Sequence, residues 1–79
     1  MPDYPEELHV EHHNNGVVVA TLNRPEVLNA FNGALRIGIN ELVTEVKQNS
    51  SVRALVLTGS GNAFCSGADL RAEDSRPWP

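Results

Sequence analysis

The sequence has one cysteine and few aromatic residues, namely one Trp, one Tyr and two Phe among 79 residues. A single cysteine cannot close an internal disulfide bond, which agrees with a reducing compartment. Hydrophobic residues make up 41% of the chain but only 5% of it is aromatic, so there is material for one small core. The length therefore allows one domain at most.

The sequence also lacks an excess of positive charge and a long apolar run. Six Lys and Arg against ten Asp and Glu give a net charge of −4, which argues against a nucleic-acid-binding or membrane-binding surface. No apolar run approaches the about 20 residues that span a bilayer. The first residues, MPDYPEELHV, carry acids and prolines where a signal peptide has basic and then apolar residues. We therefore expect a cytoplasmic protein without nucleic-acid or membrane partners.

Hydrophobic periodicity predicts two strands, a helix and a third strand, in that order. Apolar and polar residues alternate over 8–13, and the turn signal NNG at 14–16 predicts a hairpin with a second strand over 17–22. Arg24-Pro25 should end that strand because proline lacks a backbone donor.

An apolar stripe at helical spacing predicts a helix that begins at Asn32 or Gly33 and ends near Asn49. The members of the stripe are Leu35, Ile39, Leu42, Val43 and Val46. This spacing places them on one side of the helix, where they should lie against the strands.

The chain then forms an apolar strand, a glycine-rich turn and the start of a second helix. Residues 54–57 are uninterrupted and apolar, which is typical of a strand covered on both faces, and TGSGN at 58–62 is typical of its end. Gly67 permits backbone angles that other residues resist. Residues 68–70 are predicted to form a first helical turn, whose N–H groups lack intrahelical partners and would stabilise a negatively charged carbonyl oxygen. Residues 71–79 show no periodicity and are expected to be a loop or a truncated tail.

Two segments of the chain resemble motifs of the enoyl-CoA hydratase/isomerase (crotonase) family. NAFCSGADL at 62–70 is similar to the family's oxyanion-hole segment, and LNRPEVLNAF at 22–31 resembles its NRP-x-x-x-NA-[LF] segment, which lines the coenzyme A site. The order and spacing of the two segments also agree with the family. The resemblance implies that residues 1–70 are the N-terminal ββαβ part of the superhelical α/β fold (ClpP/crotonase-like) of this family.

The same resemblance implies a substrate and a set of roles. The substrate would be an acyl-CoA thioester whose carbonyl oxygen accepts two backbone N–H bonds, which stabilise an enolate-like oxyanion. The backbone N–H of Ala68 would be the first donor, and one such donor contributes about 2.7–4 kcal/mol in other enzymes. Arg24 would lie near the phosphates of coenzyme A. The other predicted contacts are Val27, Leu28 and Ala30 around the adenine and pantetheine, and Ser66, Gly67, Asp69 and Leu70 in the oxyanion segment. Coenzyme A is then part of the substrate, and no separate cofactor is expected.

Structural roles are open for the same residues. The segment 67–69 is also compatible with a simple tight connection between strand and helix, and Arg24 with a solvated side chain that follows a strand. Val27, Leu28 and Ala30 are equally compatible with ordinary packing. Asp69 is better placed to stabilise a first helical turn than to donate a proton.

Two other groups of residues invite a chemical role. Cys65 lies near the proposed oxyanion site, but no general base is identifiable for a nucleophilic thiol. His9, Glu11 and His13 share one face of the first strand, as metal ligands can, but a solvent-facing edge strand explains them as well. We expect no metal.

Syn hydration of a 2-enoyl-CoA is the reaction that the resemblance favours. Double-bond isomerisation or another reaction of the family is the alternative, because the family's catalytic acids and second oxyanion donor come from segments beyond this sequence. A sheet that ends in the third strand would also leave apolar surface exposed. We therefore predict an N-terminal piece of a longer enzyme, or a chain held by a companion fragment, that is inactive alone. A non-catalytic module that binds CoA esters is the other alternative. The resemblance implies homotrimers or hexamers for the full-length protein.

Overall fold

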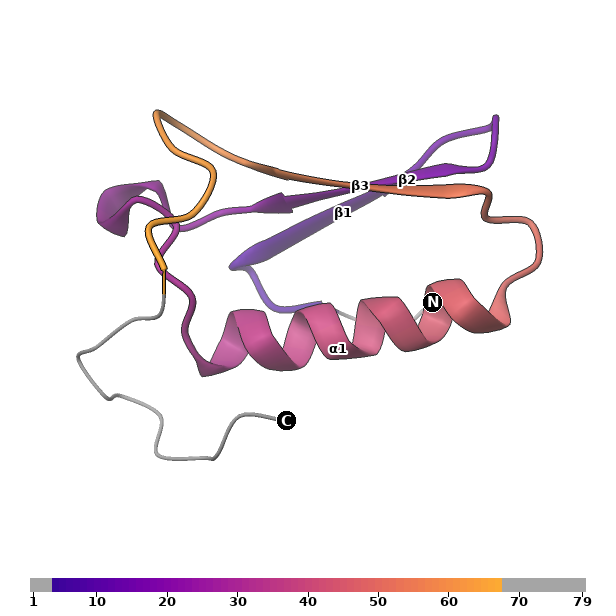
Figure 1. Cartoon of the computed structure of the whole chain (residues 1–79), viewed down its shortest axis with the longest axis horizontal. Helices are drawn as coiled ribbons and strands as arrows, with labels where there is room; N and C mark the ends of the chain where they lie inside the picture. The colour runs from indigo at the N-terminus through magenta and orange to yellow at the C-terminus, as the bar shows by residue number, and fades with distance from the viewer. Residues whose placement is uncertain (1–3, 68–79) are drawn as a thin grey trace.

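The computed structural model describes residues 4–67, which form a three-stranded sheet with one long helix packed on it (Figure 1). The elements are β1 (Leu8–His12), β2 (Val17–Leu22), the 3-10 helix η1 (Pro25–Val27), α1 (Gly33–Gln48) and β3 (Ala54–Gly59). The predicted order of strand, strand, helix and strand is therefore confirmed, and η1 is an addition to it. The predicted second helix and the tail lie outside the described residues.

β1 and β2 form the predicted antiparallel hairpin, with Leu8 opposite Leu22 and His12 opposite Val18. Its turn is closed by the backbone N–H of His13, which donates to the carbonyl oxygen of Val17 at 2.9 Å. The alternation of the sequence thus becomes the two faces of a sheet, as expected for a period of two.

α1 connects β2 to β3, which run parallel with Val17 opposite Ala54. A parallel pair needs a long crossover connection, and α1 supplies it. The helix begins after Asn32, whose Oδ1 accepts a hydrogen bond from the backbone N–H of Leu35 at 3.0 Å. The predicted limits of the helix are therefore confirmed to within one residue. The strand order β1-β2-β3 leaves β1 and β3 as the two edges of the sheet.

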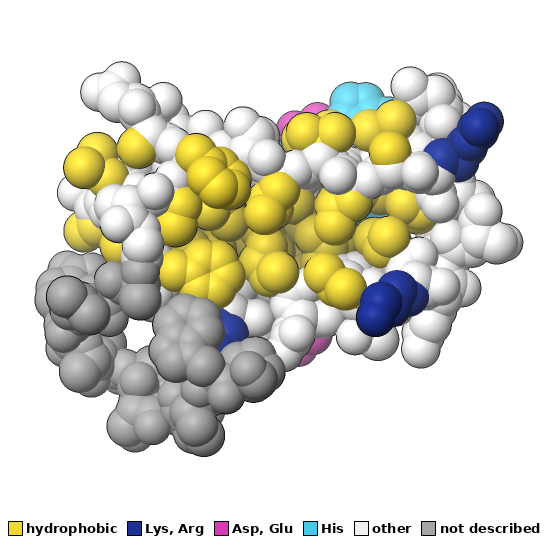
Figure 2. Space-filling model, viewed as in Figure 1, with side chains coloured by type: hydrophobic (Ala, Val, Ile, Leu, Met, Phe, Trp, Pro, Cys, Tyr) yellow, Lys and Arg dark blue, Asp and Glu magenta, His cyan; other side chains and the backbone are white. Residues whose placement is uncertain are grey.

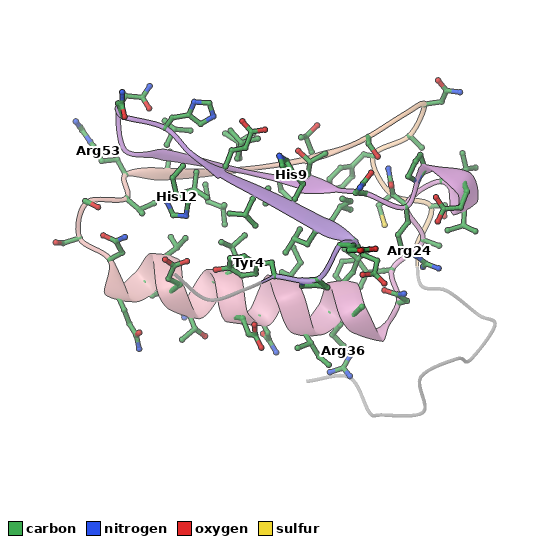
Figure 3. All side chains as sticks on the ribbon, turned by 180° about the vertical axis from the view of Figure 1, so that it is seen from behind. Tyr4, His9, His12, Arg24, Arg36 and Arg53 are labelled. Carbon is green, nitrogen blue, oxygen red and sulfur yellow. The ribbon has the colours of Figure 1, made fainter. Side chains whose placement is uncertain are left out.

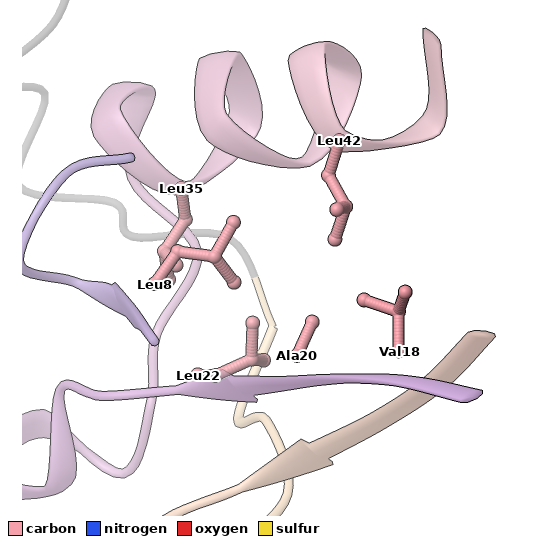
Figure 4. Close-up of a cluster of buried hydrophobic side chains, with 6 residues drawn as sticks. All are labelled: Leu8, Val18, Ala20, Leu22, Leu35 and Leu42. Atoms are coloured by element: carbon pink, nitrogen blue, oxygen red, sulfur yellow. The ribbon is translucent and has the colours of Figure 1, made fainter. Parts of the chain in front are cut away.

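The core lies between α1 and one face of the hairpin (Figure 4). β2 places every second side chain there, and Leu35 and Leu42 of the predicted stripe are completely buried. The buried hydrophobic residues are Leu8, Val18, Ala20, Leu22, Leu35 and Leu42. Ile39 and Val46 of the stripe pack against this cluster, and Val43 is half-buried. The helix thus contacts the strands as predicted.

β3 departs from the prediction. Within the described residues it is an edge strand rather than a strand covered on both faces, and Val56 and Leu57 are 45% and 42% exposed. The buried core is built from β1, β2 and α1, and residues 4–67 contain no element outside β3 that would cover it. Figure 2 shows the resulting band of hydrophobic side chains across this face of the molecule. The prediction that a sheet ending in this strand exposes apolar surface is therefore confirmed.

Candidate functional site

The two segments that resemble family motifs lie together at one end of the sheet. β2 and β3 are parallel and end side by side, with Leu22 opposite Gly59, so the chain leaves both strands at the same place (Figure 1). The backbone N–H of Ser66 donates to the carbonyl oxygen of Leu28 at 3.0 Å, and that of Phe31 donates to the carbonyl oxygen of Gly67 at 2.7 Å. Main-chain hydrogen bonds therefore connect residues far apart in the sequence.

The first segment owes its shape to a proline and to two left-handed residues. Pro25 occupies the first turn of η1, where its missing N–H costs nothing. Leu28 and Asn29 then adopt φ angles of 54° and 57°. Asparagine tolerates this conformation, whereas a residue such as leucine adopts it at a cost of about 1–2 kcal/mol. The reversal turns the backbone groups of Leu28 and Phe31 toward the second segment.

Asn29 is completely buried at the centre of this contact. Its Oδ1 accepts a hydrogen bond from the backbone N–H of Arg24 at 2.7 Å. Its Nδ2 donates to the carbonyl oxygens of Ser60 and Ala63, both at 2.8 Å. Sequence reasoning did not assign Asn29 a role, although it lies within the first motif, because its partners on the second segment are 31 and 34 positions away.

Glycine is required twice in the second segment. A Cβ at Gly59 would lie 2.7 Å from the carbonyl oxygen of Ala63 and would overlap that of Phe64, so the turn can fold back on β3 only with glycine there. Gly67 has a φ of +112°, a left-handed value that L side chains resist, as the sequence predicted.

Arg24 is buried, with 7% of its surface exposed, so the alternative of a solvated arginine is wrong. Its Nη1 donates to the carbonyl oxygen of Ala30 at 2.6 Å. Figure 3 shows it at the opposite end of the sheet from Arg53. A groove beside it is also lined by Glu6, Glu7 and Glu26, so a phosphate group there would meet carboxylates as well as the guanidinium. The predicted contact with the coenzyme A phosphates stays a prediction.

The other predicted contact residues differ in accessibility. Val27 and Ala30 are half-buried, Leu28 is 52% exposed, and Ser66 and Gly67 are exposed. Phe64 adds a second exposed apolar side chain to the same end of the sheet, at 54%. This end thus combines accessible backbone with accessible apolar surface, as a small-molecule site needs. Ala68, Asp69 and Leu70 lie outside the described residues.

The other two candidate groups lie in different surroundings. Cys65 is half-buried, packs against the core and accepts a hydrogen bond to its Sγ from the backbone N–H of Gly67 at 3.4 Å. On the exposed face of β1, Glu11 lies 3.1 Å from His9 Nε2 and 3.7 Å from His13 Nε2. Across residues 4–67, no group of three such side chains is arranged to hold a metal ion. No helix in this part of the chain has the length and apolar character to cross a membrane.

Comparison with known proteins identifies the family. A family model described as enoyl-CoA hydratase/isomerase matches residues 12–76, which is most of the chain. The chain belongs to the enoyl-CoA hydratase/isomerase family. The match confirms the resemblance of the two motif segments and extends over the strands and helix between them.

Individual members of the family match only with their N-terminal part. The 1,2-epoxyphenylacetyl-CoA isomerase of Escherichia coli K12 is 39% identical over 71 residues, which are 90% of this chain and 27% of that protein. A probable enoyl-CoA hydratase of Rhodobacter capsulatus is 52% identical over 58 residues, which are 72% of this chain and 21% of that protein. The chain therefore spans about a quarter of the length of these relatives.

The crotonase fold is confirmed by solved structures. An enoyl-CoA hydratase of Mycobacterium smegmatis superposes with a TM-score of 0.83 and 38% identity, over 92% of this chain and 28% of that structure. Residues 4–67 are accordingly an α/β part of that fold, with its first sheet strands and first long helix.

Proposed function

We propose that this chain supplies the N-terminal part of the acyl-CoA site of an enoyl-CoA hydratase, which adds water to a 2-enoyl-CoA in syn fashion. The observation that carries the proposal is the pair of backbone hydrogen bonds that joins Leu28 and Phe31 to Ser66 and Gly67. They hold the two motif segments in one place. The E. coli and R. capsulatus relatives are named for activities on coenzyme A thioesters, which supports the class of substrate.

In this proposal the backbone N–H of Ala68 is the first oxyanion donor. The carbonyl oxygen of Gly67 accepts a hydrogen bond from Phe31 at 2.7 Å, which orients the peptide group that follows. A peptide group is planar and almost always trans, so the N–H on its other side is directed away from Phe31. A donor fixed in advance in this way stabilises a developing oxyanion without reorganising during the reaction.

The remaining predicted residues bind the rest of the ester. Leu28, Val27 and Ala30 contact the adenine and pantetheine, and the exposed side chain of Leu28 supports such a contact. Arg24 attracts the phosphates through its charge, while one of its nitrogens holds the carbonyl oxygen of Ala30. Ser66, Gly67, Asp69 and Leu70 surround the thioester end. Coenzyme A enters as part of the substrate.

The rest of a crotonase domain, in the same polypeptide or in a companion fragment, completes the site in this proposal. It covers the apolar edge of β3, where Val56 and Leu57 are exposed, and brings the second oxyanion donor and the catalytic carboxylates. The chain of 79 residues is then inactive alone. The cytoplasmic location and the homotrimer or hexamer stay predictions for the complete protein.

A chimera tests this proposal. The matched N-terminal part of the M. smegmatis enoyl-CoA hydratase is replaced by this chain, and hydration of crotonyl-CoA is measured for the chimera and for the chain alone. We expect hydration by the chimera and none by the chain. A folded chimera that binds no acetyl-CoA and hydrates nothing would refute the proposal. Binding of acetyl-CoA without hydration would favour the alternatives, which are a non-catalytic module for CoA esters or, if a 3-enoyl-CoA is converted, an isomerase.

A further inference from the structure

We propose that Asn29 is a positioning residue for the acyl-CoA site. Its carboxamide fixes the turn at 60–67 against the segment 24–31, and thereby sets the orientation of the Gly67 peptide group from which the oxyanion donor projects. The inference rests on the proposed function in one respect, namely that this peptide group faces the thioester.

The carboxamide connects three backbone groups that belong to both segments. It accepts from the N–H of Arg24 at 2.7 Å and donates to the carbonyl oxygens of Ser60 and Ala63 at 2.8 Å each. Both of its N–H donors are therefore in use, and the side chain is completely buried. Water is excluded from these hydrogen bonds, so a carbonyl oxygen that lost its partner would be left unpaired.

The hydrogen bonds that hold Ser66 and Gly67 start from the residues on either side of Asn29. Leu28 provides the carbonyl oxygen that accepts from Ser66, and Phe31 provides the N–H that donates to Gly67. Leu28 and Asn29 are both left-handed, which brings these groups to the same side. The turn at 60–67 is thus attached at its first half by the Asn29 side chain and at its second half by the backbone around Asn29.

Two isosteric substitutions separate this role from a general effect of charge. Asn29→Asp replaces the two N–H donors by a carboxylate that faces the carbonyl oxygens of Ser60 and Ala63, which it cannot pair. Asn32→Asp makes the same chemical change three positions later, where the side chain only accepts from the N–H of Leu35. A carboxylate serves well as a helix N-cap, so this control should keep its hydrogen bond.

Amide hydrogen exchange provides the first measurement, with the buried turns of α1 as the internal reference. In Asn29→Asp we expect the N–H groups of Ser66 and Phe31 to exchange at least about tenfold faster relative to α1, because local opening becomes easier than global unfolding. In Asn32→Asp this ratio should stay at its wild-type value. Equal acceleration throughout the chain, or none at Ser66 and Phe31, would overturn the positioning role.

Ligand binding provides the second measurement, with acetyl-CoA labelled with ¹³C at the thioester carbonyl. We expect Asn29→Asp to weaken binding by about tenfold or more and to reduce the carbonyl ¹³C shift on binding, since small displacements of positioned groups are costly. Asn32→Asp should preserve both. A wild-type chain that fails to bind acetyl-CoA, but shows the local change in exchange, would refute the proposed function and still support the attachment of the turn by Asn29.

Two further tests guard against a variant that does not fold. Asn29→Gly keeps the left-handed backbone and removes the carboxamide, so it should reproduce the local loss of protection without a buried charge. In the wild-type chain, the Asn29 carboxamide protons should exchange as slowly as the N–H of Ser66. Rapid exchange of these protons would overturn the proposal without any substitution.

Discussion

The two edge strands of the sheet present opposite kinds of surface. β1 exposes His9, Glu11 and His12, whereas β3 exposes Val56 and Leu57. Natural sheets protect a permanent edge with charged or polar side chains, because an apolar edge pairs with other chains. The contrast indicates that β1 is a finished boundary of the fold and that β3 is an unfinished one. The candidate site lies at the end of the unfinished strand, where β3 leads into the turn at 60–67.

The largest expected effect tests whether the α1 side is the self-sufficient half. Leu35→Ala should lower the free energy of unfolding by about 2–5 kcal/mol, because it empties a completely buried position. Leu57→Ala, at a position that is 42% exposed, should lower it by less than about 1 kcal/mol. Urea unfolding measures both. Comparable losses would mean that β3 is covered in solution and that the contrast between the edges is wrong.

The next effect concerns the junction between β3 and the site. Gly59→Ala should cost about 1–3 kcal/mol, since its Cβ would overlap the backbone of residues 63 and 64. Ser60→Ala is the neighbouring control, because it removes only an exposed hydrogen bond to Asn23. Thermal unfolding compares the two variants. A Gly59→Ala variant as stable as Ser60→Ala would show that the turn at 60–67 does not approach β3 so closely.

Tyr4 provides a pH test of the finished side, where its hydroxyl donates to Glu45 Oε2 on α1 at 2.7 Å. Burial, assisted by the hydrogen bond to Glu45, raises the pKa of Tyr4 well above its usual value. An unfolded tyrosine ionises near pH 10, so the folded state then holds the extra proton and its stability falls as the pH rises above about 10.

Tyr4→Phe should therefore cost about 0.5–1.5 kcal/mol at pH 7, through the lost hydrogen bond. It should also flatten the alkaline fall, because phenylalanine has no proton to lose. Urea unfolding at neutral and alkaline pH checks both expectations. An equal alkaline slope in the two proteins would contradict the closed arrangement of the N-terminal segment on α1.

The smallest expected change in stability accompanies a change in association. Val56→Lys should alter the free energy of unfolding by no more than about 0.5 kcal/mol, because the side chain is 45% exposed. It should nevertheless reduce the self-association that we expect of the wild-type chain at high concentration. Sedimentation velocity compares it with His9→Lys on β1, which should associate as the wild type does. Equal association of all three proteins would show that β3 is not the adhesive edge.

The finished half of the fold was predictable because its signals are local. Alternation, a three-residue turn signal and one helical stripe predicted β1, β2 and α1 to within a residue or so. Each of these patterns is complete within the element that it describes. The limits of β3 were also predictable, but not its exposure, because coverage depends on which other elements the structure contains.

The candidate site was predictable in composition and not in construction. The two motifs identified the right segments, but the left-handed pair Leu28 and Asn29 has no strong local signal beyond the tolerance of asparagine. The role of Asn29 depends on carbonyl oxygens more than thirty positions away. Long-range hydrogen bonds of one buried side chain leave no periodicity in the sequence.

The central claim is that residues 24–31 and 62–67 form one acyl-CoA site at the end of β3. The most direct test is a titration of the ¹⁵N-labelled chain with acetyl-CoA, observed residue by residue by NMR. We expect saturable shifts of the amide signals in these two segments, and unchanged signals at the hairpin turn 13–16. Saturable shifts confined to the hairpin turn, or none at millimolar acetyl-CoA, would contradict the claim.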